Sequence, residues 1–185
     1  MAELREFQTG KRPVVVTPAE EATREWVEQF VVRHGLCPFA ARPLRAGKVA
    51  FVASPAADFE ACYDFARSQV QELLGRETVE TTLLIFPNAL ADFADFLDFV
   101  ATLEEALELS GVAETLQLAH FHPNYTFADV DADDPGNLTN RSPHPVVQLL
   151  RVSSVTEAVK AYPEVDQIPD RNVALLRRWY DTGAL

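Results

Sequence analysis

The chain has 185 residues and a formal net charge of −12, from 16 lysines and arginines against 28 aspartates and glutamates. Hydrophobic residues make up 48% of it, which is too many for a disordered chain and enough for one domain with its own core. The negative charge disfavours nucleic acid as a partner, because an acidic surface repels phosphate backbones. With only two cysteines, no signal sequence and no long apolar stretch, we expect a cytoplasmic protein that does not span a membrane.

The predicted elements divide the chain into an N-terminal arm, residues 1–16, and a single α/β domain, residues 17–185. Within the arm, residues 14–16 (VVV) could form a short strand. The first helix is predicted to begin at residues 17–20 (TPAE), which combine an N-cap threonine, a proline in the first turn and a capping-box glutamate. Gly35 is expected to end this helical region in a left-handed conformation.

Three short apolar runs predict strands, and amphipathic helices are predicted between them. The predicted strands are residues 49–53, 80–86 and 116–122. The first intervening helix carries an apolar stripe from Phe59 to Leu73, and the second carries phenylalanines and leucines at helical spacing. This alternation indicates an α/β fold with a small, mainly parallel sheet of about three strands and flanking helices.

A long polar segment, residues 124–145, follows the last predicted strand. Loops of this length are usually functional or disordered. Further helices are predicted at residues 146–152, 156–161 and 170–180. Sites in parallel sheets lie beyond the carboxyl ends of the strands, so we expect a functional site where the polar segment begins, near His122.

Cys37, in the sequence LCPFA, is the first candidate for chemistry. The position of a resolving cysteine is occupied by Ala40, and the motif follows a helix, so we expect neither dithiol chemistry nor a helix N-terminus behind the thiol. Residues 29–57 and 135–156 contain no acidic residue and together carry six lysines and arginines. Such local positive charge would favour a thiolate and an anionic ligand. The alternative is a buried, unreactive thiol, the role we expect for Cys62.

His120 and His122 alternate with Phe121, so both imidazole rings are expected on one side of a strand. Such a pair could bind a divalent metal together with His144 or an aspartate of the acidic run 129–134. The acidic run by itself lacks the glycine and the glutamate of a calcium-binding loop. The alternative is that both histidines are structural and hydrogen-bonded.

Two polar segments, TNRSPHP and IPDRN, predict contacts with a ligand. Arg141 offers a planar fork for a carboxylate or phosphate, and Asn140 can orient a carbonyl or amide. Arg171 and Asn172 lie in the first turn of a predicted helix, where a cation opposes the helix dipole, so Arg171 is expected to have a partner. The alternative is that these residues pin a loop and cap helices.

These segments together resemble a mostly bacterial family catalogued as domain of unknown function 1415. The resemblance covers roughly Ala22 to Trp179 and rests on LCPFA, ETTLLIFP, FHPNYTFA, TNRSPHP and IPDRN. It implies a one-domain protein whose signature segments contain Cys37, His122, Asn140, Arg141, Arg171 and Asn172. It implies no particular activity.

The first functional hypothesis is an enzyme that acts on a small anionic substrate. Cys37 would be its nucleophile and His122 its base, and the substrate would be bound by Asn140, Arg141, Arg171 and Asn172. This hypothesis requires Cys37 and His122 to come within hydrogen-bond reach.

Two other hypotheses remain open. The protein could be a non-enzymatic module that binds a small anion or a protein partner. A protein partner could dock on the helix that carries Asp92, Asp95 and Asp98 beside three phenylalanines, although an ordinary amphipathic helix has the same pattern. Alternatively, His120 and His122 could bind a divalent metal.

Overall fold

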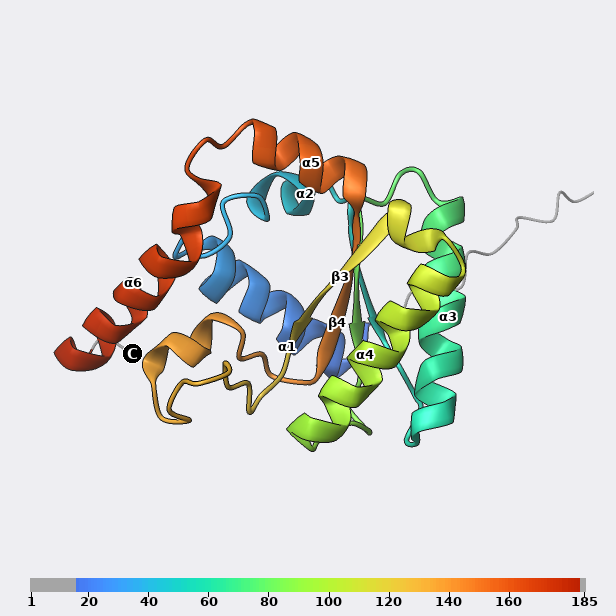
Figure 1. Cartoon of the computed structure of the whole chain (residues 1–185), viewed down its shortest axis with the longest axis horizontal. Helices are drawn as coiled ribbons and strands as arrows, with labels where there is room; N and C mark the ends of the chain where they lie inside the picture. The colour runs from blue at the N-terminus through green and yellow to red at the C-terminus, as the bar shows by residue number, and fades with distance from the viewer. Residues whose placement is uncertain (1–15, 184–185) are drawn as a thin grey trace, which may run out of the picture.

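The computed structural model describes residues 16–183 of the chain (Figure 1). In chain order its elements are α1 (Pro18–Trp26), the π-helix η1 (Val27–Val32), α2 (Ala41–Arg45), β1 (Val49–Ala53), α3 (Phe59–Gly75), β2 (Thr81–Ile85), α4 (Phe93–Leu109), η2 (Val112–Glu114), β3 (Leu116–Phe121), η3 (Pro135–Thr139), β4 (Val146–Arg151), α5 (Val152–Lys160), η4 (Val165–Gln167) and α6 (Ile168–Thr182). Residues 14 and 15 of the strand predicted in the arm lie outside the described residues. Between residues 16 and 183, no helix is long and apolar enough to cross a membrane.

The four strands form one mixed sheet in the order β1-β2-β4-β3. β1 and β2 are parallel, and β4 is antiparallel to both of its neighbours. β1, β2 and β3 therefore run in the same direction, and their carboxyl ends lie at one edge of the sheet. The α/β class is confirmed, but the sheet has four strands instead of about three, and only one of its three pairings is parallel.

The additional strand, β4, replaces the helix predicted at residues 146–152. The long polar loop consequently joins β3 to β4 instead of following the last strand. β4 is central and covered on both faces, so Val146, Val147 and Leu149 are all buried. A short apolar run of this kind has no alternation, and its periodicity cannot distinguish a buried strand from a helix. The helix predicted at residues 156–161 overlaps the second half of α5, which ends at Lys160, and the helix predicted at 170–180 falls within α6.

Helices cover both faces of the sheet (Figure 1). α3 and α4 pack on one face, where their apolar stripes meet Leu84, Val147 and Leu149. α1 and η1 pack on the other face, where Ala19 and Val27 share a cluster with buried side chains of β2 and β4. Because both faces are covered, a ligand can reach the sheet itself only at its edges.

The first helical region begins and ends as predicted. Glu20 and Thr17 form the capping box, with the Thr17 backbone N–H donating to a Glu20 carboxylate oxygen at 2.8 Å. After α1 the chain widens into the π-helix, and beyond its end the Leu36 N–H still donates to the Val31 carbonyl, five residues back, at 2.9 Å. Gly35 then turns the chain with φ of +66°. The π-turn and this glycine together direct the Cys37 segment away from the helix axis.

Candidate functional site

Cys37 lies in the turn between η1 and α2. Contrary to the expectation from the sequence, a short helix follows directly, and backbone hydrogen bonds from Phe39 and Ala40 reach the thiol. These hydrogen bonds lower the pKa of Cys37, but its burial has the larger effect and raises the pKa overall. The thiol is therefore protonated at neutral pH, which is the opposite of an activated nucleophile.

Arg171 and Asn172, at the start of α6, hold the segment that carries Cys37. The Arg171 guanidinium donates to the Gly35 carbonyl at 2.8 Å. The Asn172 side-chain amide donates to the Leu36 carbonyl at 2.7 Å. The partner expected for Arg171 is thus a backbone carbonyl, and both side chains fasten the Cys37 segment to α6.

His122 directly follows β3, and its side chain is fully buried, with 0% exposure. Its Nδ1 lies 3.0 Å from the backbone N–H of Asn124, which can only donate, so Nδ1 is an acceptor. Nε2 consequently carries the proton and donates to the Leu90 carbonyl at 3.1 Å. Burial lowers the pKa of His122, which favours this neutral form. Both ring nitrogens are engaged within the protein.

Asn140 and Arg141 hold the long loop that follows β3. The Asn140 carbonyl accepts from the His122 backbone N–H at 3.1 Å. The Arg141 guanidinium donates to the carbonyls of Tyr125 and Ala132 at 3.0 and 2.7 Å. Arg141 therefore fastens two parts of the same loop to each other, as in the structural alternative drawn from the sequence.

The predicted site residues thus form two groups. Cys37 lies with Arg171 and Asn172, whereas His122 lies with Asn140 and Arg141. The first group continues from η1, on the α1 side of the sheet (Figure 1). The His122 ring lies on the other side, 5.0 Å from the ring of Phe96 in α4. The structure does not bring Cys37 and His122 together, so no nucleophile–base pair is assembled.

The rings of His120 and His122 lie on one side of β3, as expected, because both contact Phe96. Their geometry does not suit a shared metal, since both nitrogens of His122 already have partners. Within the part of the chain that the structure describes, no group of three or more histidines, cysteines or acidic residues is placed to hold a metal ion.

A groove of about 420 Å³ opens at the carboxyl edge of the sheet, between the N-terminal ends of α3 and α4. It is lined by Ala57, Asp58, Phe59, Ala89, Leu90, Ala91, Asp95 and Asp98. These residues follow β1 and β2 along the chain, which is where ligand sites of α/β proteins are found. Among the described residues that line it, none is a lysine or an arginine.

The sequence indicated part of this groove. Asp95 and Asp98 belong to the docking face considered for α4, but Phe96 and Phe99 beside them are completely buried. Phe59, expected in the core stripe of α3, is instead 45% exposed at the groove. The rule that sites follow the carboxyl ends of strands was applied only to the segment after β3; applied to the segments after β1 and β2, it would have pointed to this groove.

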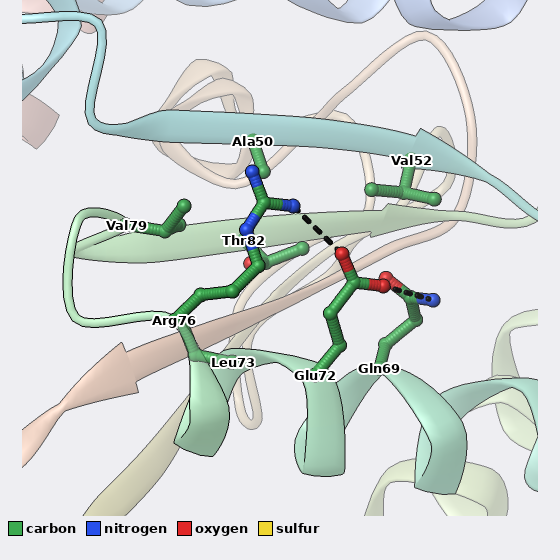
Figure 2. A pocket seen from close by; sticks show the side chains of 8 residues that line it. All are labelled: Ala50, Val52, Gln69, Glu72, Leu73, Arg76, Val79 and Thr82. Carbon is green, nitrogen blue, oxygen red and sulfur yellow. Dashed lines mark hydrogen bonds and ion pairs between the residues drawn. The ribbon is translucent and has the colours of Figure 1, made fainter. Parts of the chain in front are cut away.

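A second cavity, of about 20 Å³, lies between β1 and α3 (Figure 2). Its rim is closed by the ion pair between Arg76 and Glu72, 2.7 Å apart, and Gln69 donates to the same carboxylate at 3.4 Å. A cavity of this size holds about one water molecule. It is too small for a substrate or cofactor.

Comparison with protein families gives a match to the family described as "Protein of unknown function (DUF1415)", over residues 18–184. Neither the curated proteins nor the solved structures give a match. The matched range contains both groups of signature residues and the whole groove. Because the match extends over nearly all of the sequence, the chain belongs to the DUF1415 family of proteins of unknown function.

Proposed function

We propose that this protein is a non-enzymatic binding module whose groove between α3 and α4 takes a basic segment of a partner protein. The observation that carries the proposal is the composition of the groove wall, with three aspartates beside five apolar residues. A segment in which lysine or arginine alternates with apolar residues complements both parts of this wall.

The charge of the groove favours a cation. Asp95 and Asp98 are exposed and three residues apart on α4, so their carboxylates project from the same side of the helix. Asp58 caps α3 by accepting from the Ala61 N–H at 2.9 Å, and it is the third acidic residue that lines the groove. The helix dipole places about half a positive charge at the N-terminus of α3 and of α4. Together these offset about one of the three negative charges, so the groove stays negative.

The apolar part of the groove favours a lysine or arginine side chain over a simple inorganic cation. Such side chains lay their aliphatic stems along apolar surface and keep the charged head in water or at a carboxylate. Phe59 offers an exposed ring for the stem or for the cation itself. Ala89 and Leu90 add to the apolar lining of the groove.

The geometry supports a protein partner more than a small anion. Arg141 and Arg171, the two residues expected to bind an anion, donate to backbone carbonyls in separate parts of the fold. The groove itself has the opposite charge. An anionic ligand would find no arginine fork among the described residues that line it.

Fluorescence anisotropy with a labelled peptide of the sequence Lys-Leu-Lys-Leu-Lys tests the proposal. The variant Asp95→Asn/Asp98→Asn removes two exposed ion pairs and is expected to weaken binding by about fivefold. The variant Glu105→Gln/Glu108→Gln is the matched control, because it removes the same charge at the same spacing further along α4. We expect it to change the affinity less than about twofold.

Three results would overturn the proposal. Equal losses of affinity in the two double variants would mean that the peptide responds only to overall charge. Equally tight binding of a peptide with glutamate in place of lysine would remove charge complementarity altogether. Spermidine is the third ligand measured, and binding as tight as that of the peptide would exclude a protein segment as the preferred partner.

A further inference from the structure

We propose that His122 is the positioning residue of this groove, because its ring holds the Leu90 carbonyl and thereby fixes the groove wall at Leu90. The inference rests on the proposed function, since it explains how the binding surface is built. It also gives the signature segments FHPNYTFA and TNRSPHP a role at a site that neither of them lines.

Leu90 has an unusual backbone conformation for its residue type, with φ of +59°. In this left-handed region, the Cβ atom of a leucine crowds the backbone, and glycine or asparagine is normally found. Leu90 nevertheless keeps this conformation, and it is one of the residues that line the groove, partly buried against the core beneath. A surrounding structure that holds the residue in place is therefore required.

His122 provides the contact that keeps Leu90 in this conformation. Its Nε2–H donates to the Leu90 carbonyl at 3.1 Å, and its Nδ1 accepts from the Asn124 N–H at 3.0 Å. The ring lies beside those of Phe93 and Phe96, with centroid distances of 5.2 and 5.0 Å. The imidazole is consequently fixed in tautomer, orientation and position, and it can transmit that fixed geometry to Leu90.

The long loop fixes His122 in turn. The Asn140 carbonyl accepts from the His122 N–H at 3.1 Å, and the Asn140 amide donates to the His120 carbonyl at 3.3 Å. Arg141 holds the same loop through the Tyr125 carbonyl. A chain of direct contacts thus leads from the TNRSPHP segment through His122 to the groove.

A double-mutant cycle tests this role with the Lys-Leu-Lys-Leu-Lys peptide. His122→Phe keeps a ring between Phe93 and Phe96 but loses both hydrogen bonds, and we expect the affinity to fall by about tenfold. Leu90→Gly accepts the left-handed conformation without strain. When His122→Phe is added to Leu90→Gly, we expect a further loss of less than about twofold.

If His122→Phe lowers the peptide affinity by the same factor in the unmodified protein and in the Leu90→Gly variant, His122 does not act through Leu90 and the positioning role is overturned. The variant His122→Gln, whose amide can donate and accept, is measured in parallel and is expected to bind more tightly than His122→Phe. The unfolding midpoints of the same variants provide a readout without ligand. If the changes in unfolding midpoint caused by the two substitutions are not additive and the protein binds no peptide, the proposed function is refuted but the link between His122 and Leu90 is kept. If the changes in unfolding midpoint are additive, the link between His122 and Leu90 is refuted.

Discussion

At the scale of single residues, three arginines use their guanidinium groups to bind backbone carbonyls. Arg141 binds Tyr125 and Ala132, and Arg171 binds Gly35. Arg151 follows the same pattern, with its Nε donating to the Val79 carbonyl at 2.9 Å. The planar fork suits a carbonyl pair inside the protein as well as a carboxylate of a ligand, so the residue type alone could not distinguish the two roles.

The buried histidines make the stability of the fold dependent on pH. Burial lowers the pKa of both His120 and His122 from 6.5, so below that pH the unfolded chain binds more protons than the folded one. The free energy of unfolding is therefore expected to fall as the pH drops from about 7.5 to about 5.5. Urea denaturation at both values measures this change. Asp134 does not contribute in this window, because its pKa is lowered from 3.8.

Two variants identify the groups responsible for this pH dependence. His122→Phe removes one of the titrating groups, so its free energy of unfolding should change less with pH than that of the unmodified protein. His120→Phe removes the other titrating group and should likewise reduce the change with pH. A decrease of the same size in all three proteins would show that other groups cause it.

Cys37 should react slowly with alkylating agents near neutral pH. Burial raises the pKa of its thiol above the reference value of 9.0, so the thiolate fraction stays small until the solution is strongly basic. Iodoacetamide labelling followed by peptide mass spectrometry gives the rate at each pH. The free peptide LCPFA is the matched control, and it should react faster than the protein throughout. If the folded protein were labelled faster than the free peptide at neutral pH, Cys37 would again be a candidate nucleophile.

At the scale of elements, local signals predicted the outer parts of the fold well. The run 49–53 is β1, and the TPAE segment caps α1 with the geometry expected from its sequence. These elements are specified by residues close together in the chain. β4 could not be identified in the same way, because its strand character comes from β2 and β3 on either side and from helices on both faces.

The candidate site depended even more on tertiary structure. The sequence identified the two polar segments that surround His122, but it could not show that β3 turns His122 toward α4 while η1 carries Cys37 along the opposite face. The groove is formed by residues from the connections after β1 and after β2. Leu90 has no sequence signal at all, because leucine rarely adopts a left-handed backbone conformation.

At the scale of the whole molecule, the charges are unevenly distributed and partly neutralised. The chain carries a net charge of −12, and several of its lysines and arginines form ion pairs within the protein. Lys48 pairs with Glu80 at 2.7 Å, and Arg177 pairs with Asp134 at 2.6 Å. The ion pairs of the described residues do not include Asp95 or Asp98. The groove therefore combines local negative charge with the field of the whole protein, and the two contributions can be separated by salt.

Increasing the salt concentration from about 0.05 M to about 0.5 M should weaken binding of the Lys-Leu-Lys-Leu-Lys peptide to the unmodified protein, because the Debye length shrinks to a few ångströms. The long-range field is screened first, whereas direct contacts with Asp95 and Asp98 and the apolar contact with Phe59 persist. Anisotropy titrations at the high salt concentration should therefore still show tighter binding to the Glu105→Gln/Glu108→Gln control than to the Asp95→Asn/Asp98→Asn variant. If the two variants bound equally there, the attraction would belong to the net charge of the molecule and not to the groove.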